Sequence, residues 1–212
     1  AETLYLQALS IWEKVHGLEH PNVALGLNNL AVLYRKQGRF EEAKPLYQQA
    51  LAIRKQAFGL EHSSVAESLN NLAGLHKSQG EYAEAELLYQ QALAIREQML
   101  EPEHPDVALT LSDLAGVYEG QGKYIQAESL LQRALLIWEK VHGPEHPSIA
   151  TALNNLAHLY WRQNEYSHAE SLHKRALSIF ETVFGPEHPD VAQSLNNLAT
   201  VYTEQDKYDQ SE

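Results

Sequence analysis

A five-residue segment, Leu-Asn-Asn-Leu-Ala, returns along this chain at a constant interval of 42 residues. It begins at Leu27, Leu69, Leu153 and Leu195, and the corresponding segment at Leu111 reads Leu-Ser-Asp-Leu-Ala. Self-similarity at a fixed period of this size is typical of a stacked array of small structural repeats. Because such an array grows by adding repeats and needs no central core, we expect the 212 residues to form one array rather than two ordinary domains.

Each repeat predicts two helices that are bounded by proline and glycine. In the first repeat, Pro21 suits a first helical turn and Gly38 suits the residue that follows a helix. A longer second helix follows Phe40 and ends at Gly59, and leucine, alanine and tyrosine recur at helical spacing in both helices. The fold class predicted is therefore all-α, a right-handed α-solenoid of antiparallel helix pairs.

The repeat period also predicts the limits of each repeat in a single array over residues 1–212. Whole repeats are expected at 18–59, 60–101, 102–143 and 144–185, between a second helix at 1–17 and a first helix at 186–212. This last helix is expected to start at Pro189 and end near Gln205, and a stub, Ser211-Glu212, follows it. Ala1 and Ser211 occupy the same position in the repeat, so we expect a piece of a longer array.

The repeated pattern of Leu-Ala, tyrosine, Gly-x-aromatic, alanine, tyrosine and alanine resembles the tetratricopeptide repeat. That repeat usually has about 34 residues, and the extra length here lies in the second helix and in a Gly-x-Glu-His-Pro loop, as in 143–147 and 185–189. This long form is similar to the cargo-binding repeats of kinesin light chains and their bacterial relatives. The resemblance covers the whole chain and implies a protein-binding scaffold, although the motor-binding coiled coil of the light chains is not among these residues.

Composition restricts the partners of this chain. It contains no cysteine, which rules out disulfides and thiolate metal sites and suits a reducing compartment such as the cytoplasm. The formal charge of -12 opposes binding to nucleic acid, because that affinity comes largely from Lys and Arg. No apolar run approaches the length that a membrane-spanning helix needs. We therefore expect a cytoplasmic protein with a protein partner, and neither nucleic acid nor membrane.

The asparagine pairs are the first candidate for a binding site. Each asparagine side chain offers a donor and an acceptor, so it can pair with a peptide bond, and asparagine is a mediocre helix former that needs a reason to recur within helices. We expect both members of each pair to point away from the core, onto the concave face. The alternative is that they hydrate a helix face or bond adjacent repeats. The candidates are Asn29, Asn71, Asn155 and Asn197, with Asn28, Asn70 and Asn154 beside them.

The resemblance implies that the second asparagine of each pair binds the backbone of an extended peptide. Nearer the turn, the same helices carry Arg35, Lys36, Lys77 and Arg162, which in an acidic chain favour an acidic peptide segment. The resemblance likewise implies short acidic peptides that carry an aromatic residue. The alternative is that these cations only solubilise the surface. Gly74, within a helix, indicates either a shallow pocket or close helix packing.

Histidine is abundant, but its spacing does not favour a metal site. His20, His62, His104, His146 and His188 occur once per repeat, so stacked helices would hold them about 10 Å apart, too far to share an ion. Their place before a helix indicates helix capping or loop packing. His76 and His173 stand where other repeats have a core tyrosine. No nucleophile, base and orienting group come together, so we expect no catalysis, no cofactor and no metal.

A second interpretation is a structural spacer that associates with itself. The last helix would lack a partner for Leu195, Leu198 and Tyr202, and the first helix would lack its mate. Since the two ends are in the same phase of the repeat, head-to-tail stacking of molecules would cover both. The alternative to a peptide-binding scaffold is therefore a repeat module that stacks through its open ends.

Overall fold

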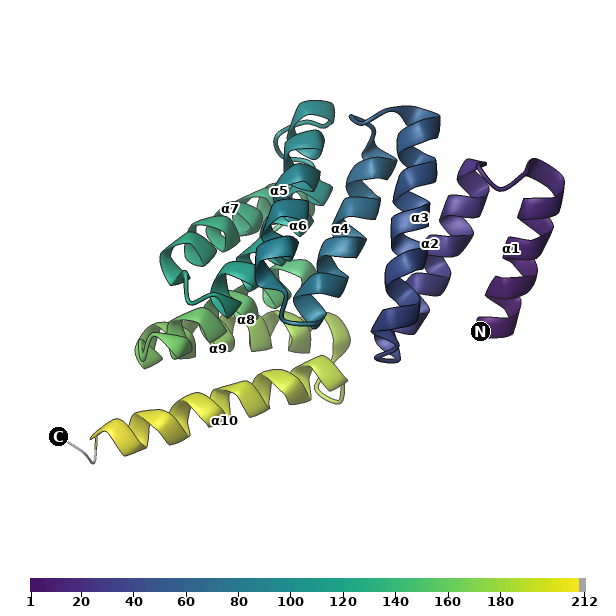
Figure 1. Ribbon diagram of the computed structural model, residues 1–212. Coiled ribbons are helices and arrows are strands. Elements are labelled where there is room, and N and C mark those ends of the chain that lie inside the picture. The colour runs from purple at the N-terminus through teal and green to yellow at the C-terminus, as the bar shows by residue number, and fades with distance from the viewer. Residues whose placement is uncertain (210–212) are drawn as a thin grey trace. The chain divides into compact units, whose positions relative to one another are not determined.

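The structure is a computed structural model that describes residues 1–209, with side chains as far as Gln205 (Figure 1). The described residues form ten α-helices and no strand. The helices are α1 Glu2–His16, α2 Pro21–Lys36, α3 Phe40–Phe58, α4 Ser63–Ser78, α5 Tyr82–Met99, α6 Pro105–Gly120, α7 Tyr124–His142, α8 Pro147–Arg162, α9 Tyr166–Phe184 and α10 Pro189–Asp209. The prediction of an all-α repeat fold is confirmed.

One helix boundary differs clearly from the prediction. The last helix, α10, runs to Asp209 rather than ending near Gln205. In the first repeats a glycine follows the corresponding helix, whereas Asp206 stands at that position here. Without the glycine, nothing in the sequence favours a turn. The predicted stub Ser211-Glu212 lies outside the described residues.

The chain divides into two compact units, one from Ala1 to Pro102 and one from Glu103 onward. Unit 1 contains α1 to α5, and unit 2 contains α6 to α10. Within each unit, every helix packs against the helix that precedes or follows it in the chain (Figure 1). In unit 1, α2 also contacts α4 directly. The first helices of successive repeats therefore meet on one side of unit 1, and this meeting decides where a ligand could lie.

Alanine marks the places where helices cross. Ala31, Ala73 and Ala157 in the first helices, and Ala50 and Ala134 in the second helices, are 0% exposed. The absence of a long side chain lets two helix axes approach, while leucines fill the space around the crossing. The faces predicted from helical spacing are thus buried at these crossings, whereas Ile11 of α1 and Ala199 of α10 are exposed.

The turn between the two helices of a repeat requires a left-handed residue. Gly38 has a φ of 76°, and the corresponding residue of the fourth repeat, Asn164, has a φ of 62°. Asparagine is one of the few other residues that tolerate this region. In the first repeat, Gly38 N–H donates to the Arg35 carbonyl at 3.0 Å and Arg39 N–H to the Tyr34 carbonyl at 2.9 Å. The turn therefore fixes where the end of α2 lies.

The histidine before each first helix is an N-cap, as predicted. The His62 Nδ1 accepts a hydrogen bond from the Ser64 N–H at 3.1 Å, and the His146 Nδ1 accepts from the Ser148 N–H at 3.2 Å. The same contact is made by His20, His104 and His188. A side-chain acceptor of this kind satisfies an amide that the helix leaves unpaired, a contribution of about 1 kcal/mol. These Nδ1 atoms are therefore occupied by the fold.

Candidate functional site

The asparagine pair of the first repeat joins two repeats. Asn28 is only 3% exposed, and its Oδ1 accepts a hydrogen bond from the Nδ2 of Asn71 at 2.9 Å. The expectation that both members of a pair point away from the core is wrong for Asn28. It lies four residues after Ala24 and three before Ala31, on the stripe where the helices cross. Asn28 is thus a structural contact between α2 and α4.

The second asparagines keep hydrogen-bonding capacity. Asn29 is half-buried and Asn155 is exposed, and neither has a hydrogen-bond partner among the described residues. Asn71 uses one N–H on Asn28 and leaves its own Oδ1 open, whereas the Oδ1 of Asn197 accepts from Gln193 at 2.9 Å and leaves its Nδ2 open. Asn70, the first asparagine of the pair on α4, is half-buried. The second position of each pair therefore still offers a donor or an acceptor.

In unit 2 the first asparagine of a pair is again engaged within the fold. The Oδ1 of Asn154 accepts a hydrogen bond from the Nδ1 of buried His173 at 2.7 Å, and its Nδ2 donates to Ser194 at 3.3 Å. This contact joins α8, α9 and α10. Burial lowers the pKa of His173 to about 4, and the nearby charge of His158 acts in the same direction. His173 is therefore a neutral core residue, as expected of a substitute for tyrosine.

Arg35 reaches from α2 across α4 and lies over Gly74. A Cβ built on Gly74 would collide with the Arg35 Nη1 and would lie 3.5 Å from its Cζ and 3.3 Å from the hydroxyl of Tyr89. The space that Gly74 leaves is thus occupied by a guanidinium, which settles why glycine is accepted within this helix. The Tyr47 hydroxyl lies within the field of the same charge and is buried with no hydrogen-bond partner among the described residues.

No carboxylate neutralises Arg35 among the residues that the structure describes. Lys36 and Lys77, in the last turns of α2 and α4, have no ion-pair partner in that part of the chain either. Arg162 belongs to unit 2, where its Nη2 donates to the hydroxyl of Tyr124 at 3.3 Å, which raises the pKa of Arg162. The structure therefore places Arg35 and Lys77 on α2 and α4, which are in contact in unit 1. Arg162 lies on α8 in unit 2.

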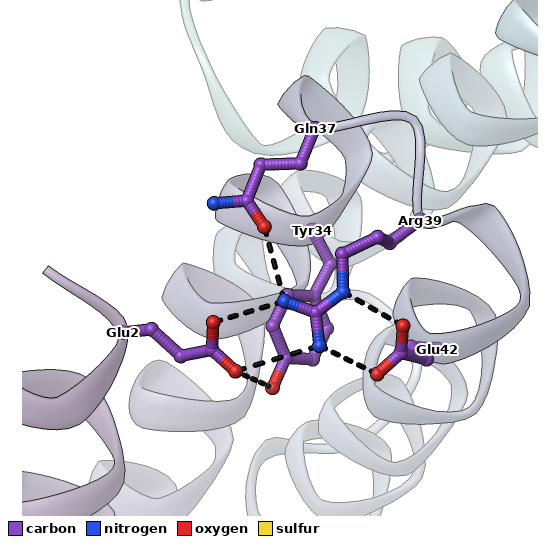
Figure 2. Close-up of polar contacts among 5 residues, drawn as sticks. All are labelled: Glu2, Tyr34, Gln37, Arg39 and Glu42. Atoms are coloured by element: carbon purple, nitrogen blue, oxygen red, sulfur yellow. Dashed lines mark hydrogen bonds and ion pairs between the residues drawn. The ribbon is translucent and has the colours of Figure 1, made fainter.

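The next arginine in the chain shows how a fully engaged cation differs from Arg35. Figure 2 shows Arg39 between Glu2 and Glu42, with ion-pair distances of 2.9 and 2.6 Å, and with its guanidinium over the ring of Tyr34. Hydrogen bonds from Arg39 hold the pKa of both carboxylates below the usual range, and the bond from Tyr34 to Glu2 raises the pKa of that phenol. Arg39 therefore ties α1 to the turn after α2 and has little capacity for a ligand.

The contact between Arg35 and Gly74 has counterparts in unit 2 with different chemistry. The positions recur at Glu119 and His158, which form an ion pair at 2.7 Å between α6 and α8. They recur again at Trp161 and Thr200, which line one cavity between α8 and α10. We call the surface of the first helices that carries these contacts and the second asparagines the inner face of each unit. In unit 1 it carries Arg35 and Lys77, and in unit 2 it carries the ion pair of Glu119 with His158 and the cavity at Trp161 and Thr200.

Other site classes find no support in the described residues. No group of three or more His, Asp or Glu side chains lies close enough there to hold a metal ion. None of the described helices combines the length and the apolar character that crossing a bilayer requires. His76, the other histidine at a tyrosine position, is buried and contacts Glu81 at 2.5 Å, which lowers the pKa of that carboxyl.

Sequence reasoning missed the cavity in unit 2 and the pairing between neighbouring repeats. Neither Trp161 nor Thr200 was among the residues predicted from the sequence. The available signal was a comparison between the position of Arg35 in each repeat and the position of Gly74 in the next repeat. Residues at these two positions meet between α2 and α4 in unit 1 and between α6 and α8 in unit 2. Each second-helix histidine also needed a partner, and Asn154 supplies it for His173.

Comparisons with known proteins agree with this geometry. The family model described as tetratricopeptide repeat matches residues 1–56, 23–98, 106–182 and 169–212. The crystal structure of BtubC (BKLC) from P. vanneervenii has a TM-score of 0.81 at 24% identity, over 95% of this chain and 82% of that one. The putative kinesin light chain from Podosopora anserina, with nearly identical TPR-like repeats, has a TM-score of 0.76 at 29% identity, over 90% of both chains. No curated protein matches significantly. The resemblance to kinesin light chain-like repeats is confirmed.

Proposed function

This chain belongs to the tetratricopeptide repeat family, and from that premise we propose that the inner face of unit 1 binds an extended, acidic segment of a partner protein. Repeats of this family act in general as protein-interaction scaffolds rather than as enzymes. The observation that carries the acidic preference is the guanidinium of Arg35, which is held over Gly74 without a carboxylate partner among the described residues. An unneutralised, half-buried guanidinium recognises a carboxylate through paired hydrogen bonds.

The asparagines would supply recognition of the backbone. Asn29 has a free amide, and Asn71, three residues before the glycine over which Arg35 lies, has a free Oδ1. An extended peptide can pair its N–H and C=O groups with such amides whatever its own side chains are. Asn155 and Asn197 would act in the same way in unit 2, with Arg162 as a weaker source of charge. Asn28 and Asn154, which the fold already uses, would support these contacts rather than bind the peptide.

A direct test uses a labelled extended peptide rich in Glu and Asp, and the matching peptide of Gln and Asn. We expect the acidic peptide to bind with micromolar affinity, since an extended chain must lose conformational entropy on binding. Arg35→Gln and the double variant Asn71→Ala, Asn155→Ala should each weaken binding about tenfold or more, as should a rise in salt. Fluorescence anisotropy with folded variants measures each effect.

Lys14→Gln is the matched control, because it removes the same charge from an exposed position of α1. It should leave the affinity within about twofold. If Lys14→Gln and Arg35→Gln lower the peptide affinity equally, the effect comes from the net charge of the chain and not from the position of Arg35. Unchanged binding in the double asparagine variant would move the peptide away from the inner face.

A second candidate function is self-association through the ends, as a structural spacer. On α1, Ile11 is 60% exposed, although the residue at its position is 5% exposed in α3 and in α7. On α10, Leu195 is 50% exposed, although Leu153 at the same position of α8 is fully buried. Leu198, which we expected to be uncovered, is only 6% exposed because it faces the core of unit 2. The two exposed faces are the two sides of one repeat, so a second copy would fit them.

Stacking of this kind is an open contact that can run on into filaments. We expect the sedimentation coefficient to rise with protein concentration, and the charge introduced by Leu195→Glu to prevent this rise. A monomer that stays the same size at every concentration would rule out the spacer interpretation. Peptide binding in unit 1 would be unaffected by Leu195→Glu.

A further inference from the structure

Unit 2 contains a cavity of about 130 Å³ on its inner face, between α8, α9 and α10. It is lined by His158, Trp161, His173, Asn197, Thr200 and Val201. The ring of His173 is fixed at the cavity by its bond to Asn154. A void of roughly 150 Å³ with apolar walls can hold a group the size of benzene. The cavity therefore has room for one branched aliphatic side chain but not for an indole ring.

One side chain at this cavity has a donor with spare capacity. Asn197 has its Oδ1 occupied by Gln193, which leaves the Nδ2 of its amide available. This donor is matched by a carbonyl oxygen of a peptide backbone. The indole Nε1 of Trp161 is buried, so Trp161 contributes the surface of its ring to the cavity wall rather than a donor.

The charge at this cavity differs from that in unit 1. The only charged contact at its rim among the described residues is that of His158, which is paired with Glu119 at 2.7 Å. An acidic side chain would therefore meet no free cation here, and it would be close to the Glu119 carboxylate. A neutral, apolar side chain fits both the volume and the charge.

We propose that this cavity is a side-chain pocket for a leucine-sized residue of an extended peptide, of which one carbonyl oxygen accepts a hydrogen bond from Asn197 Nδ2. This proposal rests on the proposed function and extends it with an apolar requirement. A segment bound to the inner face of unit 2 would then carry an aliphatic side chain, whereas a segment bound to the inner face of unit 1 would carry a carboxylate.

The test uses small probes, N-acetyl-leucine-methylamide and the corresponding alanine and tryptophan compounds. The chain has three tryptophans, so its indole N–H signals can be followed individually in a proton–nitrogen spectrum, with Trp161→Phe identifying the signal of interest. We expect the leucine compound to shift the Trp161 signal with about millimolar affinity. The alanine compound should bind about tenfold or more weakly, because it lacks the buried methyl groups, and the tryptophan compound should not fit.

Thr200→Phe and Thr200→Ala are a matched pair at an exposed position of α10, and circular dichroism checks that both fold. Filling the cavity with Phe should abolish the shift, whereas Ala should keep the affinity within about twofold. The proposal fails if no probe shifts the signal, if leucine and alanine compounds bind equally, or if binding survives in Thr200→Phe. These outcomes leave the Arg35→Gln comparison of the acidic-peptide test untouched, since that comparison depends on unit 1 alone.

Discussion

Lowering the pH from about 7 to about 4.5 should destabilise unit 2 by up to about 3 kcal/mol through one residue, His173. Burial lowers the pKa of this histidine to about 4 in the folded protein, whereas it returns to its usual value near 6.5 on unfolding. Between these two values the unfolded chain binds a proton that the folded chain does not. Stability is therefore complete above about pH 6.5 and falls as the pH approaches 4.

His173→Gln is the matched variant for this prediction, because an amide can still donate to the Oδ1 of Asn154 but does not titrate. Its unfolding free energy should depend less on pH than that of the original chain, and the difference should appear between about pH 6.5 and about pH 4. Urea unfolding, together with hydrogen exchange of the α9 amides, measures it locally in a chain of repeats. If both chains lose the same stability over this range, His173 is not the group responsible.

The second large effect concerns the pairing of Arg54 with Ser68. Arg54 is buried, and its Nη1 donates to the Ser68 Oγ and to the Ser64 carbonyl, both at 2.9 Å, with Glu67 at 3.2 Å. In the preceding repeat the same two positions hold Trp12 and Gly26. A Cβ on Gly26 would lie 3.0 Å from the Trp12 ring, so the indole needs the glycine. The large residue and its small neighbour in the next repeat are therefore matched in both of these pairs.

We expect Arg54→Trp alone and Ser68→Gly alone each to lower the free energy of unfolding by about 2 kcal/mol. The first removes the buried partner of the Ser68 hydroxyl and crowds the Ser68 side chain, and the second removes a partner of a buried charge. The double variant reproduces the Trp12 and Gly26 pair, so it should recover about 1 to 2 kcal/mol of the summed loss. Chemical denaturation of the four proteins completes the cycle. Strictly additive losses would contradict the matching.

Much of the fold could be predicted because proline, glycine and histidine punctuate every repeat. Pro21 and Gly38 gave the limits of α2 within two residues, and the position of His62 correctly indicated a cap. The end of α10 could not be predicted, since the absence of a glycine does not say where a helix stops. Helix propensity predicts that a segment is helical, whereas the residue at which α10 ends also depends on the residues that follow it.

The candidate site was less accessible to sequence reasoning, because its contacts join residues about 40 positions apart. Helical spacing placed Asn28 and Asn29 together on the surface, yet one step of about 100° separates a buried amide from a half-exposed one. The role of Gly74 likewise depends on Arg35 in the preceding repeat. An alignment of the repeats would have revealed this contact, because it places the equivalent of Arg35 in each repeat beside the equivalent of Gly74 in the next.

The bond between Asn28 and Asn71 has a consequence for the direction in which a ligand runs. An unrestrained asparagine can turn its amide by half a rotation, exchanging oxygen for nitrogen, and can therefore pair with a peptide of either polarity. Asn71 has lost this freedom, because its nitrogen is committed to the Oδ1 of the preceding repeat. Its Oδ1 has no hydrogen-bond partner among the described residues. Under the proposed function, this oriented amide would distinguish a segment from the same segment read backwards.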